Sequence, residues 1–231
     1  MPLPLHRTLA LPGPAGRLEA VLWSPPDRED GLRPALAAVV CHPHPLFGGT
    51  MHNKVVYQTA KSLHRFGLPV LRFNFRGVGA SEGIHDNGHG EREDVTAALD
   101  YLAENNPGVP LLLAGFSFGS WVGLRVGCGD PRVTELIGLG LPVGNLEHRG
   151  FSFLDACGKP KLLVSGEFDQ YGPPGNLRAL VAQFPPQVKE QTSVTIIPAA
   201  DHFFTGHLSE LDRAITAWIA TRHPNLAASE V

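Results

Sequence analysis

The chain has 231 residues, with 19 Lys and Arg against 22 Asp and Glu, and a formal net charge of −3 when the histidines are neutral. A chain of this length can bury one large core, so we expect a single domain over residues 1–231. The near-neutral balance, without a basic run longer than a pair, argues against nucleic acid or an anionic membrane surface as a partner.

Apolar runs and turn residues predict alternating strands and helices. Two β-prone segments, 6–11 and 16–23, flank the turn residues Pro12-Gly13-Pro14 and predict a hairpin. Further strands are predicted at residues 35–41, 69–75, 110–114, 133–141, 161–165 and 193–197. Helices are predicted near residues 55–66, 91–104, 117–126, 175–184 and 207–222.

This alternation predicts an α/β fold: a doubly wound, mostly parallel sheet with an N-terminal antiparallel hairpin and right-handed crossovers. The segment 142–158 is too short to form a large cap. In such sheets the functional groups gather in the loops at the carboxyl ends of the strands.

The N-terminus and the cysteines indicate the compartment. The first residues, MPLPLHRTLALPGPAG, have no basic region ahead of an apolar run, and no run reaches ~18 apolar residues. Cys41, Cys128 and Cys157 are odd in number and widely spaced, which argues against a disulfide framework. We therefore expect a soluble cytoplasmic protein, of an oligomeric state that the sequence leaves open.

The pattern G-x-S-x-G, typical of the nucleophile turn of serine hydrolases, occurs twice, around Ser117 and around Ser81. Ser117 stands between the apolar run PLLLA and a predicted helix, as a nucleophile turn requires. Ser81 is followed by EGIHDNGHG, which is too rich in Gly, Asn and Asp to begin a helix. We predict that Ser117 is the nucleophile and Ser81 a turn residue; the alternative for Ser117 is a tight turn without chemistry.

A serine hydroxyl needs a base to take its proton, and the base needs an acid to fix its tautomer. Asp169 lies four residues past a predicted strand, and His202 lies between the last predicted strand and the last helix. The alternatives are a turn role for Asp169, with Glu167 as the acid, and a buried structural role for His202. All three residues follow strands in the order Ser, acid, His, which favours a catalytic triad of Ser117, Asp169 and His202.

Four blocks of the sequence, CHPHPLFGGTMHNKVV, LRFNFRGVGASEG, LLLAGFSFGS and ADHFF, resemble the α/β-hydrolase family. The resemblance extends from about residue 17 to 222. More narrowly, the four blocks resemble the small lidless bacterial hydrolases grouped with carboxylesterases and dienelactone hydrolase-like proteins. It implies an esterase that acts through an acyl-enzyme intermediate and needs no cofactor. Dienelactone hydrolases proper usually have Cys as the nucleophile, so Ser117 favours simple ester hydrolysis.

The resemblance also implies an oxyanion hole. One donor is the backbone N–H of Phe118, and the other comes from the loop after the strand that ends at Cys41. Where many relatives have His-Gly-x, this chain has HPHPL, and neither proline has an N–H to donate. The second donor is therefore His44 or Leu46, and we favour His44.

The expected partner is a small-molecule ester. The short segment 142–158 implies an open site for short-chain esters, with Phe47, Trp121 and Phe203 as substrate-binding residues and Phe118 and Phe204 as further candidates for apolar lining. Trp121 and Phe203 could equally belong to the core. A serine peptidase, thioesterase or acyltransferase on the same fold is the alternative function, followed by a non-catalytic binding protein.

The histidines near the predicted oxyanion loop, among them His42, His44 and His85, suggest a metal. The spacings HxxEH and HExxH and a pair of neighbouring cysteines are missing, so we expect no metal site. The alternative reading is that His42 bonds the backbone and holds the loop. The resemblance suggests that Arg76 and Glu82 brace the loop around Ser81; the alternative is that both are solvated surface charges.

Overall fold

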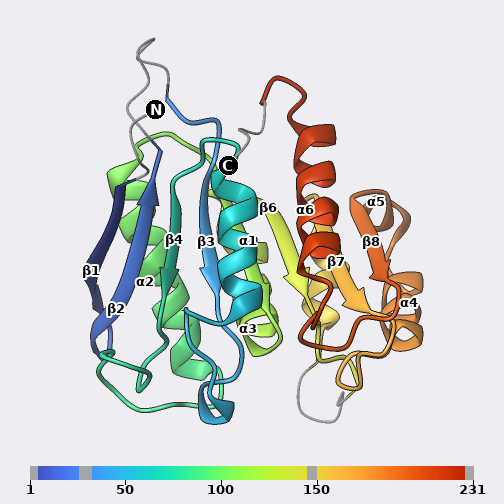
Figure 1. Ribbon diagram of the computed structural model, residues 1–231, viewed down its shortest axis with the longest axis horizontal. Helices are drawn as coiled ribbons and strands as arrows, with labels where there is room; N and C mark the ends of the chain where they lie inside the picture. Colours follow the sequence, from blue (N-terminus) through green and yellow to red (C-terminus); the bar gives the residue numbers. More distant parts are fainter. Residues whose placement is uncertain (1–4, 26–32, 145–149, 227–231) are drawn as a thin grey trace.

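The computed structural model describes residues 5–25, 33–144 and 150–226. Its strands form one sheet in the order β1-β2-β4-β3-β5-β6-β7-β8 (Figure 1). The strands are β1 (Leu5–Gly13), β2 (Gly16–Ser24), β3 (Ala37–Cys41), β4 (Val70–Phe73), β5 (Leu111–Phe116), β6 (Val133–Leu139), β7 (Lys161–Gly166) and β8 (Thr192–Ile197). β2 pairs antiparallel with β1 and with β4, and the other neighbours are parallel. The predicted fold class is thereby confirmed.

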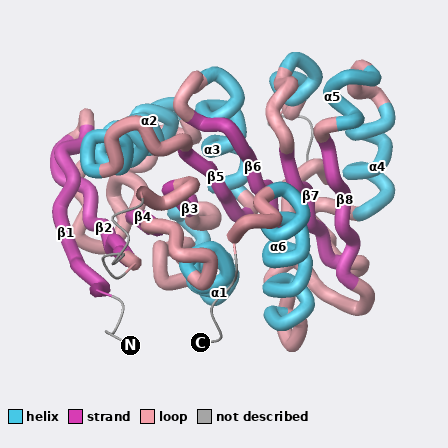
Figure 2. Tube along the Cα trace, turned by 90° about the horizontal axis from the view of Figure 1, so that it is seen from above, coloured by secondary structure: helices cyan, strands magenta, loops and turns pink. Residues whose placement is uncertain are grey.

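Helices cover both faces of the sheet (Figure 2). One face carries α1 (Lys54–His64) and α6 (Leu208–Arg222). The other carries α2 (His89–Asn105), α3 (Phe118–Gly129), α4 (Pro174–Ala182) and α5 (Pro186–Glu190). Two short 3-10 helices, η1 (Pro45–Phe47) and η2 (Ser152–Ala156), lie in the loops that follow β3 and β6. None of the helices in the described ranges is long and apolar enough to cross a membrane.

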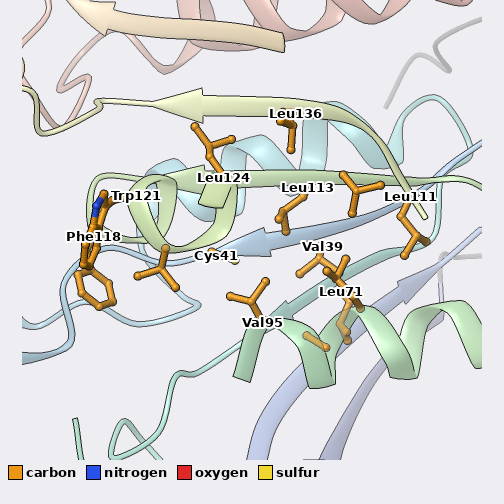
Figure 3. Close-up of a cluster of buried hydrophobic side chains, with 14 of the residues drawn as sticks. Val39, Cys41, Leu71, Val95, Leu111, Leu113, Phe118, Trp121, Leu124 and Leu136 are labelled. Atoms are coloured by element: carbon orange, nitrogen blue, oxygen red, sulfur yellow. The ribbon is translucent and has the colours of Figure 1, made fainter. Parts of the chain in front are cut away.

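Apolar side chains fill the space on both sides of the sheet. Val39 and Cys41 of β3 face the α2/α3 side, where they join Leu113 of β5 and Phe118 of α3 in one core cluster (Figure 3). Their neighbours in the strands, such as Val40, belong to the cluster beneath α1 and α6. Because successive strand residues point to opposite faces, a strand that is covered on both sides reads as a continuous apolar run.

Several predicted boundaries differ from the observed ones. The strand predicted to Leu141 ends at Leu139, because Gly140 takes a left-handed φ of 51° that turns the chain out of the sheet. The strand predicted to Phe75 ends at Phe73. The helix α5 and both 3-10 helices were not predicted, since segments this short do not develop a helical apolar period.

Candidate active site

Ser117 stands at the turn between β5 and α3. Its φ of 54° and ψ of −118° place it outside the regions that non-glycine residues ordinarily adopt. The turn is tight because α3 begins directly against the strands: a Cβ at Gly115 would clash with the carbonyl oxygen of Gly119, and a Cβ at Gly119 with the carbonyl oxygens of Cys41 and His42. Both glycines of the motif are therefore required by the close approach of strand and helix.

The structure brings the three predicted triad residues together at the carboxyl edge of the sheet. Nε2 of His202 lies 3.1 Å from Oγ of Ser117, and Nδ1 of His202 lies 2.9 Å from both carboxylate oxygens of Asp169. With its Nδ1 proton directed at the carboxylate, the imidazole presents Nε2 as the acceptor for the serine proton. Asp169 and His202 are 2% and 3% exposed, so this contact is shielded from water.

Backbone and ring contacts hold the acid and the histidine in place. Oδ1 of Asp169 accepts the N–H groups of Tyr171 at 2.9 Å and Gly172 at 2.8 Å. The His202 ring packs edge-on against Tyr171 and Phe203, at centroid distances of 4.7 and 5.1 Å. Glu167, the alternative acid, instead accepts the N–H of Ala199 at 2.8 Å. The geometry therefore favours Asp169 as the carboxylate that orients the imidazole.

The loop after β3 approaches the nucleophile turn from the other side. The His44 ring lies 4.8 Å from the Phe118 ring, and Phe118 is the first residue of α3. The N–H of Leu46 donates to Nδ1 of His44 at 3.2 Å, so the alternative oxyanion donor is already engaged within its own loop. This arrangement favours the backbone N–H of His44 over that of Leu46 as the second candidate oxyanion donor.

His42 fastens that loop to the sheet. Its Nε2 accepts the N–H of Phe75 at 2.9 Å, which leaves the proton on Nδ1, where it is donated to the carbonyl oxygen of Pro43 at 2.6 Å. Burial lowers the pKa of His42 to about 3, so the ring is neutral. Both ring nitrogens are used by the backbone, as the structural reading of His42 requires. Within the described ranges, no group of three or more His, Cys, Asp or Glu side chains is arranged to hold a metal ion.

The predicted lining residues differ in exposure. Phe47 and Phe203 are 85% and 40% exposed, and Phe203 lies beside His202. Trp121 is buried in the core cluster next to Phe118 (Figure 3), and Phe204 is fully buried against the other face of the sheet. Phe204 is therefore a core residue, and most of the Trp121 side chain packs inside the protein.

Other exposed apolar side chains lie in the same set of loops, and none of them was predicted as a lining residue; Leu46 was named only as a candidate oxyanion donor. They are Leu46 after β3, Ile84 after β4, and Phe168 and Tyr171 after β7. Large apolar side chains on the surface cost free energy unless something covers them, and contiguous apolar surface marks binding sites. The signal that could have identified them is their position in loops that follow predicted strands.

The second G-x-S-x-G motif is structural. Oγ of Ser81 donates to the carbonyl oxygen of Asn74 at 2.7 Å and accepts the N–H of Glu19 at 2.9 Å, which ties the loop to β2. Arg76 in the same loop forms a buried ion pair with Asp94 of α2 at 2.8 Å. These contacts agree with the bracing role expected for Arg76, and Ser81 has its hydroxyl engaged away from His202.

Comparisons with known proteins agree with this geometry. A family model described as an alpha/beta hydrolase domain matches residues 37–218. An uncharacterised protein of Rickettsia prowazekii (strain Madrid E) is 38% identical over 218 residues, which cover 92% of this chain and 88% of that protein.

Two solved structures are similar over nearly the whole chain. One is an alpha-beta serine hydrolase homologue from Coxiella burnetii, 36% identical with a TM-score of 0.83, covering 93% of this chain and 97% of the other. The second is a serine hydrolase without a lid from Xanthomonas campestris, 32% identical with a TM-score of 0.81, covering 100% of this chain and 99% of the other. The chain therefore belongs to the alpha/beta hydrolase family, and it matches the small lidless serine hydrolases within it.

Proposed function

We propose that this protein is a serine esterase that hydrolyses short-chain carboxylic esters through an acyl-enzyme intermediate. The observation that carries the proposal is the continuous hydrogen-bonded chain from Oγ of Ser117 through the His202 ring to Asp169, with contacts of 3.1 and 2.9 Å. A nucleophile in contact with a base, and a base in contact with a buried acid, is the arrangement that activates a serine.

The proposed reaction has two halves. Oγ of Ser117 attacks the ester carbonyl carbon while Nε2 of His202 takes the serine proton. The bond to the alcohol oxygen then breaks, and His202 gives that proton to the departing alcohol. A water molecule, deprotonated by the same imidazole, attacks the acyl-enzyme and releases the acid. Asp169 stabilises the imidazolium that forms in each half, and the cycle uses these side chains, backbone N–H groups and water.

The backbone N–H groups of Phe118 and His44 are the proposed oxyanion donors. Phe118 is the N-terminal residue of α3, where the positive end of the helix dipole favours negative charge. The engaged N–H of Leu46 supports His44 as the second donor. A single donor of this kind contributes about 3–4 kcal/mol to transition-state stabilisation.

The proposed substrate class follows from the exposed loops. Phe47, Tyr171 and Phe203 present apolar surface close to the triad loops, which suits the apolar part of a small ester. Between β6 and β7 the described residues include one short 3-10 helix, η2, and residues 145–149 lie outside the described ranges. The similarity to a serine hydrolase without a lid also supports an open site.

Covalent labelling tests the nucleophile. We expect a fluorophosphonate probe to label the wild type and not Ser117→Ala, because Oγ of Ser117 is the group in contact with His202. Ser81→Ala is the matched control: it removes the serine of the second motif and should leave labelling intact. Labelling that survives Ser117→Ala contradicts the assignment, and a wild type that is neither labelled nor active on esters indicates a binding protein.

A panel of p-nitrophenyl esters of increasing acyl length tests the substrate class. Activity should be highest for short acyl chains and fall for long ones, since an open site offers limited apolar surface. A steady rise of activity to long chains would show that a deep acyl channel exists. Faster turnover of matched amides or thioesters, or transfer to an alcohol acceptor in preference to water, would favour the peptidase, thioesterase or acyltransferase alternatives.

A further inference from the structure

The loop between β4 and α2 brings an imidazole, that of His85, to the proposed oxyanion donors. The His85 ring lies 5.0 Å from the His44 ring and 5.6 Å from the Phe118 ring, measured between ring centroids, and the His44 and Phe118 rings are 4.8 Å apart. These are the distances of rings in packing contact. The His85 side chain is 7% exposed. His85 therefore packs against both residues whose N–H groups are the proposed oxyanion donors.

Glu91 in the first turn of α2 fixes the position of His85. Oε1 of Glu91 lies 2.7 Å from Nδ1 of His85 and accepts the N–H of Asp86 at 2.9 Å. Oε2 of Glu91 accepts the N–H of Gly88 at 2.7 Å. The Glu91 side chain is fully buried, and a buried carboxylate costs free energy unless polar groups surround it, so the fold keeps these contacts together. One side chain thus anchors the imidazole and the loop backbone that carries it.

The same loop packs closely against the first turn of α3. Gly88 has a left-handed φ of 91°, and a Cβ added there would clash with the Trp121 ring. Trp121 lies three residues after Phe118 in α3, and the centroids of their rings are 6.0 Å apart. The loop therefore contacts the start of α3 at two places, through the His85 ring and through the backbone of Gly88. Because protein interiors are densely packed, a shift of the loop displaces this turn.

Ring packing, and not a directed hydrogen bond, links His85 to the two donor residues. Within the described ranges neither ring nitrogen of His85 has a partner at hydrogen-bond geometry, so its contact with Glu91 is a short electrostatic one. The faces and edges of the ring then make the contacts with His44 and Phe118. A different ring of similar size at position 85 should keep these contacts, whereas a small side chain should not.

We propose that His85 is a positioning residue of the oxyanion hole: held by Glu91, its ring sets the distance between the loop that carries His44 and the first turn of α3. The inference rests on the proposed esterase function. The two donors come from separate elements, and both have to point at one oxygen atom of the tetrahedral intermediate. A displacement of about 1 Å in such a site lowers the rate by about 100-fold. His85 acts through the donors and does not touch the reacting atoms.

Kinetics of the full chain with p-nitrophenyl acetate test the proposal. In His85→Ala, kcat should fall about 10- to 100-fold while KM changes less than about threefold, because oxyanion donors act on the transition state and hardly on the bound ester. The inhibition constant of a trifluoromethyl ketone, which forms a tetrahedral adduct with a nucleophilic serine, should rise by the same factor. His85→Phe keeps a ring and should restore kcat to within roughly fivefold of the wild type. His89→Ala, an exposed histidine at the start of α2, is the matched control and should behave like the wild type.

The outcomes separate this inference from the proposed function. A His85→Ala variant with the kcat and inhibition constant of the wild type, or with a change in KM alone, overturns the role of His85 and leaves the esterase function standing. An equal loss of kcat in His85→Ala and His85→Phe overturns it as well. A wild type that is neither labelled by a fluorophosphonate nor active on esters overturns the proposed function and this inference together. Should circular dichroism show that His85→Ala does not fold, Glu91→Gln carries the test: kcat should fall several-fold at an unchanged KM, and an unchanged kcat contradicts the proposal.

Discussion

Oγ of Ser117 lies 3.1 Å from Nε2 of His202, and the serine makes this contact from a backbone conformation that side chains rarely adopt. A residue with φ near 54° and ψ near −118° stores about 1–3 kcal/mol of strain, and such strain persists only where the surrounding packing enforces it. Here the close approach of Gly115 and Gly119 to neighbouring backbone enforces it. The strained turn therefore lowers the stability of the fold, and it directs the Ser117 hydroxyl at the imidazole of His202.

The strain predicts that Ser117→Gly is more stable than Ser117→Ala. Glycine adopts a positive φ without a Cβ clash, so the free energy of unfolding of the glycine variant should be roughly 1 kcal/mol higher, while neither variant should react with a fluorophosphonate. Urea denaturation followed by circular dichroism measures the difference. A glycine variant no more stable than the alanine variant would mean that the turn carries no strain.

Asp169→Asn should lower kcat for a p-nitrophenyl ester by about 10³-fold or more with little change in KM. An amide at this position can donate to Nδ1 of His202 and so favour the tautomer whose Nε2 cannot accept the serine proton. Glu167→Gln is the control, because Glu167 contacts the N–H of Ala199. A larger loss in Glu167→Gln than in Asp169→Asn would identify Glu167 as the acid.

The sheet, and the edge of it at which the three candidate triad residues meet, could be predicted because their signals are local. Strands that are covered on both faces, such as β3 and β5, have to be apolar throughout, so they appear as uninterrupted runs between turn residues. Each candidate triad residue lies in the turn or loop that follows a strand, Ser117 directly and Asp169 and His202 a few residues later. Parallel strands carry such residues to one edge, whatever the separation along the chain.

The exposure of single side chains could not be predicted in this way. Trp121 and Phe47 are both aromatic residues near strand ends, yet one is buried and the other 85% exposed. Phe204 lies in the core and has a left-handed φ of 50°, and no sequence pattern around it predicts this backbone conformation. Lys161 is buried at a strand start where a lysine suggests exposure, and its Nζ donates to the carbonyl oxygen of Cys157, which lies outside that strand. Tertiary packing decides each of these cases.

Gly119→Ala should destabilise the fold by roughly 2 kcal/mol or more, because its Cβ would meet the backbone carbonyls of Cys41 and His42, which cannot move without separating β3 from α3. Gly129→Ala, in the last turn of the same helix, has nothing within 4 Å of the added Cβ. That variant should be neutral or more stable by up to about 1 kcal/mol. The urea midpoints of the two variants, compared with that of the wild type, measure this difference in stability. Similar decreases in both midpoints would show that the close packing at Gly119 does not cause the destabilisation.

Protonation of His42 should couple the stability of the fold to pH. Burial lowers its pKa in the folded state to about 3, whereas in the unfolded chain it is close to 6.5. Below about pH 6.5 the unfolded state therefore binds a proton on His42 that the folded state does not. The free energy of unfolding should therefore fall as the pH drops from 6.5 towards 3, by up to about 1.4 kcal/mol per pH unit. Above pH 6.5 the ring is neutral in both states and this loss is absent. Nitrogen-detected NMR of the folded chain at pH 5 should still show a neutral ring with its proton on Nδ1, because Nε2 accepts the N–H of Phe75. The urea-unfolded chain, in which no folded structure holds the histidines, supplies the reference spectrum. A His42 imidazolium at pH 5 in the folded chain would mean that these backbone hydrogen bonds do not hold the His42 ring.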